Sequence, residues 1–307
     1  MPRSTANDAA PLVLAIGQFD GVHRGHQAVF RAAVESARAA AGVPGCLTFF
    51  PHVAQLLDPA RAPLLLATPE QNQALIAAAG IAQIHAFPFT REFAAMDPEE
   101  FLALLKLEFP ALAEIVVGRN FTFGRNRAGH SGTLPALAAA IGCRAQIVPH
   151  VELDGAPVSS TRIRAAVAAG DLPLAKAMLG RPFSLTGAVV HGRAVGRTLG
   201  FPTANIRPDL PIRPAPGIYA ARLRLPDGPR PGAAFVPDPA DPAQAHFGAV
   251  VEIHVPGLAR DLYGQRVEID FSRRLRGHMP FPDAAAASAQ IARDSAQALA
   301  VDAQDNP

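Results

Sequence analysis

The sequence predicts an α/β protein in which a domain built on a parallel sheet is followed by a small antiparallel β-barrel and a C-terminal helix. Two observations lead to this fold class. Short apolar runs alternate with helical patterns in the first half, as in parallel sheets with helices on both faces. Short strand-like runs separated by glycine and proline fill the second half, as in antiparallel barrels or sandwiches. This change in pattern places the domains at residues 1–183 and 184–307.

The first half supplies the strands and helices of the predicted parallel sheet. Apolar runs predict strands at 12–16, 45–50, 82–87, 114–118 and 145–150, and helical spacing predicts helices at 26–41, 69–79, 97–108 and 131–142. The third helix has an orderly start, because Asp97 is a good N-cap and Pro98 suits a first helical turn. Ligands of such sheets bind beyond the carboxyl ends of the strands.

The second half supplies the predicted barrel. The strand-like runs are "SLTGAVVHG", "GIYAARLRL", "GAVVEIHV" and "QRVEIDFS". Residues 226–246 contain too many prolines for a central strand, so we expect a loop or an edge strand there. An alanine-rich segment from Asp283 to about Ala300 predicts one closing helix.

The composition excludes several classes of function. A hydrophobic content of 49% and a charged content of 18% are ordinary for a globular protein, and a net charge of +2 argues against nucleic-acid or membrane partners. The N-terminal apolar run is short and interrupted, so it predicts neither a signal peptide nor a membrane span. Cys46 and Cys143 form no metal or redox motif, and we expect buried thiols in a cytoplasmic protein. The oligomeric state is left open.

The stretch "AIGQFDGVHRGHQAVF" at residues 15–30 joins the first strand to the first helix. Gly17, Gly21 and Gly25 allow a tight turn or a close approach of a ligand to the backbone. A glycine-rich turn that opens a helix binds anions, because free N–H groups and the helix dipole point at the ligand. His23 and His26 can donate hydrogen bonds to a phosphate group there. The alternative interpretation is a capping histidine beside a buried one.

The segment "GQFDGVHRGH" resembles the first signature of the nucleotidyltransferase module in bacterial bifunctional riboflavin kinase/FAD synthetases. The motifs at 118–129, 158–183, 185–206, 216–223 and 261–276 follow in the same order. The resemblance implies a Rossmann-like nucleotidyltransferase domain that transfers AMP from ATP to FMN, giving FAD and pyrophosphate. It implies a barrel that transfers the γ-phosphate of ATP to riboflavin. The expected substrates are riboflavin, FMN and ATP, with Mg²⁺.

The resemblance also implies roles for residues of the first module. His23 and His26 would contact the ATP phosphates, and Arg164 would reach the leaving pyrophosphate. The other nucleotide- or flavin-binding positions would be Gly17, Phe19, Asp20, Gly25, Asn120, Ser159, Ser160 and Thr161. The alternatives are an ordinary turn asparagine at 120 and a plain helix cap with a solvated arginine at 159–164.

In the second module, Thr203 and Asn205 of "GFPTAN" match Mg²⁺–ATP ligands. Both offer hard oxygen donors, and alternate residues of a strand face the same way. Glu252 matches the base that would take the proton from the ribityl hydroxyl, although a glutamate in an alternating strand often only faces solvent. The loop over the nucleotide would contain Gly192, Gly196 and Arg197.

Two segments depart from the family pattern. "TFFPHV" at 48–53 has Phe50 where a carboxylate is usual and Val53 where a proline is usual. In residues 232–246, Phe235 and Pro237 stand where an asparagine and a glycine are expected. Because lost charge-assisted hydrogen bonds cost about 1.5–3 kcal/mol each, we expect a weakened kinase.

Three alternative functions follow. One is a divergent paralogue that only transfers adenylyl groups, and another is a non-catalytic flavin- or nucleotide-binding regulator. The intact "HRGH" and "SSTRIR" motifs argue against the regulator, because a sensor needs no pyrophosphate-handling residues. An unrelated nucleotidyltransferase, acting on pantetheine phosphate or nicotinate mononucleotide, would explain the first half but not "GFPTAN".

Overall fold

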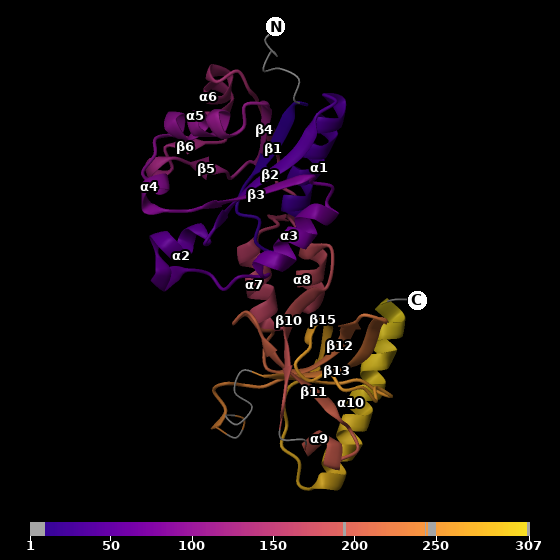
Figure 1. Cartoon of the computed structure of the whole chain (residues 1–307). Coiled ribbons are helices and arrows are strands. Elements are labelled where there is room, and N and C mark those ends of the chain that lie inside the picture. Colours follow the sequence, from indigo (N-terminus) through magenta and orange to yellow (C-terminus); the bar gives the residue numbers. More distant parts are fainter. Residues whose placement is uncertain (1–9, 193–194, 243, 245–249, 306–307) are drawn as a thin grey trace. The chain divides into compact units, whose positions relative to one another are not determined.

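The computed structural model describes residues 10–192, 195–242, 244 and 250–305. Contacts divide the chain into two compact units (Figure 1). The first comprises Met1–Pro63 and Pro69–Ser159, and the second comprises Leu64–Thr68 and Ser160–Pro307.

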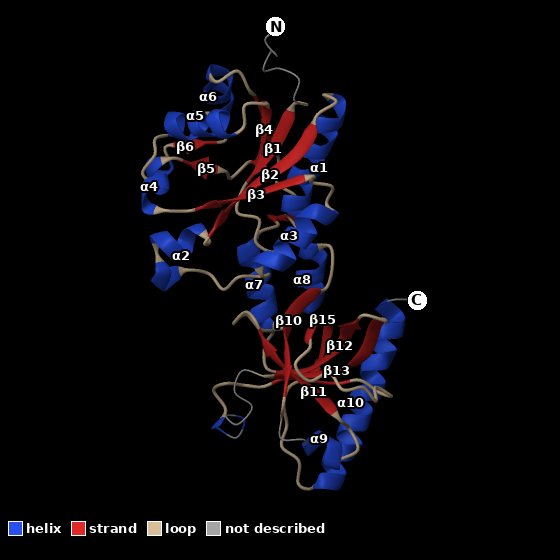
Figure 2. Ribbon diagram, in the orientation of Figure 1, coloured by secondary structure: helices blue, strands red, loops and turns tan. Residues whose placement is uncertain are grey.

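The described residues of the first unit form a five-stranded parallel sheet in the order β3-β2-β1-β4-β7 (Figure 2). Its strands are β1 (Leu12–Ile16), β2 (Val43–Phe50), β3 (Gln83–Pro88), β4 (Leu112–Gly118) and β7 (Arg144–Val148). Its main helices are α1 (Arg24–Ala39), α3 (Pro69–Ala78), α5 (Pro98–Glu108) and α6 (Leu134–Ala140). The predicted Rossmann-like α/β architecture is confirmed.

The remaining elements of this unit are short. They are α2 (Val53–Leu57), η1 (Pro59–Arg61), α4 (Arg91–Ala94), η2 (Arg125–Arg127), the paired strands β5 (Thr122–Phe123) and β6 (Gly129–His130), and the paired strands β8 (Glu152–Leu153) and β9 (Ala156–Pro157). Several of them follow the carboxyl ends of the long strands, where ligands of parallel sheets bind.

Two hydrophobic cores cover the two faces of the sheet, because alternate residues of a strand point to opposite faces. Leu12, Leu14 and Ile16 of β1 pack into the core beneath α5 and α6. Val13 and Ala15 pack into the core beneath α1. Continuous burial along β1 explains why this strand reads as an unbroken apolar run.

The start of α5 follows the expected capping chemistry. Asp97 is the N-cap, Pro98 is in the first turn, and the Asp97 N–H donates to Glu100 Oε2 at 2.8 Å. This arrangement is a capping box, which satisfies backbone donors that the helix cannot pair itself. The predicted N-cap is confirmed.

The second unit begins with α7 (Ser160–Ala169) and α8 (Leu172–Leu179). Its described strands close a barrel in the order β10-β11-β14-β13-β12-β15 (Figure 2). The strands are β10 (Phe183–Val190), β11 (Thr203–Pro208), β12 (Gly217–Leu225), β13 (Gly228–Val236), β14 (Val251–His254) and β15 (Arg266–Arg276), with helices α9 (Val195–Thr198) and α10 (Ala284–Asp305). The predicted antiparallel barrel and closing helix are confirmed.

The expectation of a loop or edge strand at 226–246 is wrong for its first part. β13 lies inside the closed barrel, between β12 and β14. Pro229 and Pro231 face only β12, because β14 pairs with β13 no further than residues 233–235. At these positions a proline can therefore lack its N–H without breaking a hydrogen bond to β14. Residues 243, 245 and 246 of this segment lie outside the described residues.

Two further expectations concern the environment of the protein. Cys46 and Cys143 are free and buried, as predicted. None of the helices that the structure describes combines the length and the apolar composition needed to span a bilayer. The predicted absence of a signal peptide concerns N-terminal residues that lie partly outside the described part of the chain.

Candidate active sites

The turn between β1 and α1 begins at the carboxyl end of the central strand. Gly21 has a φ of 77°, which the absence of a Cβ permits. Val22 follows with a φ of 39°, an uncommon conformation for a β-branched residue. The Gly21 N–H donates to Asn72 Oδ1 at 2.9 Å, so α3 helps to hold this conformation. Asp20, predicted to shape the turn, is buried.

His23 is the N-cap of α1. Its Nδ1 accepts hydrogen bonds from the N–H groups of Gly25, at 3.1 Å, and His26, at 3.4 Å. An imidazole nitrogen that accepts hydrogen bonds carries no proton, so the neutral ring holds its proton on Nε2. A Cβ at residue 25 would lie 3.0 Å from the His23 ring, which explains the glycine there. His23 is therefore both a capping residue and an oriented Nε2–H donor.

The His26 ring stacks on the His23 ring, with centroids 3.6 Å apart and an interplanar angle of 22°. The Phe19 ring meets it edge-on at 5.2 Å. Burial first, and the neighbouring His23 second, hold the pKa of His26 well below its ordinary value of 6.5. Its Nδ1 is buried without a hydrogen-bond partner among the described residues. The lowered pKa favours the neutral His26 ring, which can still donate one hydrogen bond.

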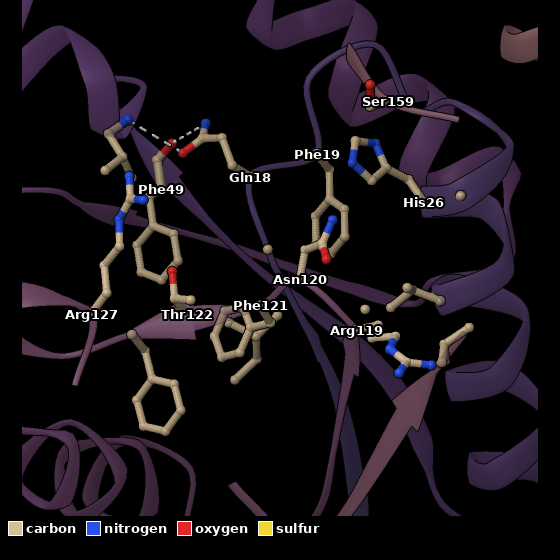
Figure 3. Close-up of a pocket in the computed structure, with 18 of the residues that line it drawn as sticks. Gln18, Phe19, His26, Phe49, Arg119, Asn120, Phe121, Thr122, Arg127 and Ser159 are labelled. Atoms are coloured by element: carbon tan, nitrogen blue, oxygen red, sulfur yellow. Dashed lines mark hydrogen bonds between the residues drawn. The ribbon is translucent and has the colours of Figure 1, made fainter. Parts of the chain in front are cut away.

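The turn opens into a cavity of about 750 Å³ (Figure 3). Of the residues predicted for this site, its lining includes Gly17, Phe19, His23, Gly25, His26, Asn120 and Ser159. Figure 3 also shows Arg119, Thr122 and Arg127 around the same cavity. These residues follow β4, the strand beside β1. The sheet thus brings together two loops that are about a hundred residues apart in sequence.

Phenylalanine side chains form an aromatic wall of this cavity, and sequence reasoning missed it. Its members are Phe49, Phe89, Phe93, Phe101, Phe121 and Phe123. Neighbouring rings lie 5.4–5.9 Å apart, within the range of favourable aromatic contacts. The alternation of Phe121 and Phe123 in "NFTFG" was the available signal, since alternate strand residues share a face. Such a wall fits a flat heteroaromatic ring.

Asp20 belongs to the first unit but is not among the lining residues, and the remaining residues predicted for the first module belong to the second unit. Ser160 begins α7, and Thr161 and Arg164 lie within its first two turns. Arg164 Nε donates to the Leu64 carbonyl at 2.6 Å. Their proposed contacts with ATP stay a prediction.

The altered "TFFPHV" segment borders the first cavity. Val53 lines the cavity, whereas Phe50 is absent from its lining and is 56% exposed. The segment therefore contributes an apolar side chain to the cavity at the position where the family usually has proline.

A second cavity, of about 410 Å³, lies within the second unit. Thr203 and Glu252 line it from β11 and β14, and Thr203 Oγ1 lies 3.4 Å from Glu252 Oε2. Asn205 is the cross-strand partner of Glu252, so the three side chains lie on one face of the barrel wall. The geometry brings the predicted metal ligands and the predicted base together.

The predicted nucleotide loop approaches this group closely. A Cβ at residue 192 would lie 2.4 Å from Asn205 Oδ1, and a Cβ at residue 196 would lie 2.4 Å from the Phe201 carbonyl oxygen. Side chains at Gly192 and Gly196 would therefore displace the loop. Gly196 lines the second cavity, and Arg197 is exposed in α9.

Several lining residues of the second cavity were not predicted, including Phe201, His254, Arg276, His278, Phe281 and Asp294. Arg276 holds the buried Asp294 of α10 through two nitrogens, with Nη2 2.6 Å from Oδ2. This charge-assisted pair joins β15 to α10. Phe235, the divergent residue of β13, also lines the cavity, 5.8 Å from the His278 ring.

Among the described residues, no cluster of three or more histidine, cysteine, aspartate or glutamate side chains could hold a metal ion. Thr203, Asn205 and Glu252 nevertheless offer a hydroxyl, an amide oxygen and a carboxylate on one face of the barrel. Mg²⁺ is usually bound by few protein oxygens together with substrate phosphates, so this donor set fits a nucleotide-bound magnesium ion.

A turn with glycines and two histidines on a parallel sheet, in one chain with a barrel that carries a hydroxyl, an amide and a carboxylate on one face of its wall, is the arrangement of a two-domain nucleotide-dependent transferase. The sequence model of the FAD synthetase family matches residues 5–162, and that of the riboflavin kinase family matches residues 179–301. The chain belongs to the family of bifunctional riboflavin kinase/FMN adenylyltransferases, which are enzymes of flavin cofactor biosynthesis.

Relatives of that name match nearly the whole chain. The protein from Escherichia coli K12 is 33% identical over 283 residues, covering 92% of this chain and 90% of its own. That from Pseudomonas fluorescens is 34% identical, covering 94% and 92%, and that from Bacillus subtilis 168 is 29% identical, covering 95% and 93%.

A solved structure described as a macrolide-efflux protein from Streptococcus pneumoniae has a closely similar fold. Its TM-score is 0.82 at 28% identity, and the match covers 95% of this chain and 93% of that one.

Proposed function

We propose that the chain makes both flavin cofactors: it phosphorylates riboflavin to FMN and adenylylates FMN to FAD. The observation that carries this proposal is that the chain has two cavities, each lined by residues suited to one of the two reactions. The first has the His23–His26 turn and an aromatic wall. The second has Thr203 and Glu252 in contact distance within the barrel. ATP would serve as co-substrate of both reactions.

In adenylyl transfer, a phosphate oxygen of FMN attacks the α-phosphorus of ATP. A new P–O bond forms, the bond between the α-phosphorus and the bridging oxygen breaks, and pyrophosphate leaves. The protein needs no nucleophile of its own, because positioning and charge stabilisation supply the catalysis. His23 Nε2–H and the N-terminal dipole of α1 would stabilise the negative charge on the phosphates.

The aromatic wall gives this site a place for a flat ring beside the phosphate-binding turn. Flavin and adenine rings both stack on aromatic side chains, and Asn120 supplies an amide in the lining of the same cavity. Arg164 would contact the leaving pyrophosphate, as its match to the family motif suggests.

In phosphoryl transfer, the terminal ribityl hydroxyl attacks the γ-phosphorus of ATP. A P–O bond forms, the bond to the β-γ bridging oxygen breaks, ADP leaves, and Glu252 accepts the hydroxyl proton. Thr203 and Asn205 would hold Mg²⁺, which neutralises phosphate charge when it is bound. Gly192, Gly196 and Arg197 would form the loop over the nucleotide.

A second candidate function is adenylyl transfer alone, and the position of Phe235 favours it. This side chain lines the second cavity, next to Glu252 across the β13–β14 pair. A polar recognition group has thus been replaced by an apolar one at the proposed riboflavin site. We therefore expect riboflavin phosphorylation to be the weaker activity, with a raised KM, because a lost recognition group can weaken riboflavin binding without changing the rate of the chemical step.

Both proposed reactions act on dissolved metabolites, which suggests a cytoplasmic location.

One assay tests both proposals. The purified full-length chain is incubated with ATP, Mg²⁺ and either riboflavin or FMN, and the products are separated by chromatography. Formation of FMN from riboflavin and of FAD from FMN supports the bifunctional enzyme. FAD formation without phosphorylation at saturating riboflavin supports the adenylyltransferase-only paralogue. Binding of flavin without either product would support the non-catalytic regulator.

A further inference from the structure

Gln18 lies between two parts of the first cavity that come from separate segments. It follows β1 in the phosphate-binding turn, and it lines the cavity beside Phe19. Its side chain reaches the segment between β2 and α2, as the dashed lines in Figure 3 mark. Gln18 Nε2 donates to the Phe49 carbonyl at 3.2 Å, and the Val53 N–H donates to Gln18 Oε1 at 3.4 Å.

The part of this segment that follows Phe50 is short and buries little surface, whereas Phe50 itself is paired with β3, where the Phe89 N–H donates to the Phe50 carbonyl at 2.9 Å. α2 is one short helix of five residues, and none of its residues is buried. The apolar side chains of Phe50 and Leu57 on either side of Val53 are 56% and 59% exposed. A segment with so little buried surface opens at low free-energy cost. Yet Val53 and Leu57 form part of the cavity lining.

We infer that Gln18 is a positioning residue for adenylyl transfer, which holds α2 against the cavity so that its apolar side chains pack on the flat ring of the flavin substrate. The inference rests on the proposed function of this cavity. It predicts that loss of the Gln18 contacts weakens FMN binding while the phosphate chemistry continues. Gln18 touches α2 through backbone groups, so its effect on the reaction is indirect.

The contact to Val53 uses a backbone N–H, so among substitutions at this position only proline removes the donor. Val53 is the first residue of α2, a position that proline tolerates well. The preceding residue, His52, has φ −55° and ψ 132°, the extended conformation that suits a residue before proline. Val53→Pro therefore removes one hydrogen bond to Gln18 and leaves the helix start intact.

The experiment compares the full-length protein with Val53→Pro, Gln18→Met and the double variant. Methionine keeps the length of glutamine but forms neither hydrogen bond. Each neutral hydrogen bond is worth roughly a twofold to tenfold change in an equilibrium. We expect the KM for FMN to rise about threefold in Val53→Pro and about tenfold in Gln18→Met, with kcat within about twofold of the parent. The double variant should match Gln18→Met, because both changes remove the same contact to Val53.

Amide hydrogen exchange supplies a readout that does not depend on activity. Exchange in residues 54–57 should accelerate in Gln18→Met and in Val53→Pro, while exchange in α5 stays unchanged. Gln27→Met is the matched control, since Gln27 Nε2 donates to the Val22 carbonyl at 2.9 Å within the same turn. This control should leave exchange in α2 unchanged.

The outcomes separate the two proposals. If the parent protein makes FAD but the Gln18 and Val53 variants keep its KM for FMN and its exchange in α2, the role of Gln18 is refuted. If kcat falls with KM unchanged, Gln18 acts on the chemistry and the inference is equally wrong. If the parent makes no FAD, the proposed function fails, and the exchange data alone decide whether Gln18 holds α2.

Discussion

Replacing His23 separates its capping role, which the structure shows, from its proposed role as a donor to phosphate. Its Nδ1 caps α1 by accepting two backbone N–H groups, and its Nε2 carries the proton that can be donated to a phosphate. Asparagine is also a strong N-cap, but its side chain is too short to place a donor where Nε2 lies. His23→Asn should therefore keep the cap and lose the donor, whereas His23→Ala should lose both.

The expected magnitudes follow from these contacts. Loss of an N-cap costs about 1 kcal/mol, which corresponds to about fivefold faster exchange of the first amides of α1. Loss of one oriented donor to a developing charge costs on the order of a hundredfold in rate. We expect His23→Ala to show both effects and His23→Asn to show only the loss of rate.

Two measurements on the same samples test this expectation: amide exchange of the first turn of α1, and formation of FAD from FMN and ATP. Exchange reports on this helix alone, which matters in a chain of two units. FAD synthesis near the parent rate in His23→Asn would refute the donor role and leave His23 as a cap. Unchanged exchange in His23→Ala would refute the capping role.

Further predictions concern both cavities. His26→Ala should lower FAD formation at least about tenfold, and unchanged FAD formation in a folded variant would remove His26 from the site. Because the pKa of His26 is held well below 6.5, the unfolded chain takes up a proton that the folded chain excludes as the pH falls below 6.5. The unfolding free energy should therefore decrease as the pH is lowered below 6.5, and it should decrease less steeply in His26→Ala than in the parent protein. Equal slopes of unfolding free energy against pH in the two proteins would contradict this. Arg164→Ala should impair adenylyl transfer and spare riboflavin phosphorylation, and parallel losses in the two assays would contradict a pyrophosphate role. Glu252→Gln should lower the kinase kcat about a hundredfold or more at saturating riboflavin, since glutamine cannot accept the proton, and an unchanged kcat would exclude Glu252 as the base.

Much of the fold could be predicted from local patterns. The central strands β1 and β4 are buried along most of their length, so each appears in the sequence as a short apolar run. The prediction failed at β13, because the proline rule assumes that a strand is paired along its whole length. Pro229 and Pro231 lie where only β12 is adjacent, and a sequence does not state where a neighbouring strand ends.

The site residues could be predicted where they lie together within one sequence motif. His23 and His26 stand three residues apart, and Thr203 and Asn205 alternate on one strand. The aromatic wall escaped prediction because its rings come from β2, β5, α4, α5 and neighbouring loops, and only folding brings them together. The ion pair of Arg276 with Asp294 is likewise formed between a strand and a helix eighteen residues further on.

The contribution of α10 to the second cavity has a consequence for synthesis of the chain. Ala287, Ile291 and Asp294 line that cavity, whereas the lining of the first cavity ends at Ser159. Domains generally fold as units while the ribosome still adds residues to the C-terminus. All residues around the first cavity have therefore been synthesised when about half of the chain has been made. The lining of the second cavity is complete only after α10 has been synthesised. A chain that ends before residue 287 would have the complete lining of the first cavity and all six barrel strands, but it would lack the α10 side of the second cavity.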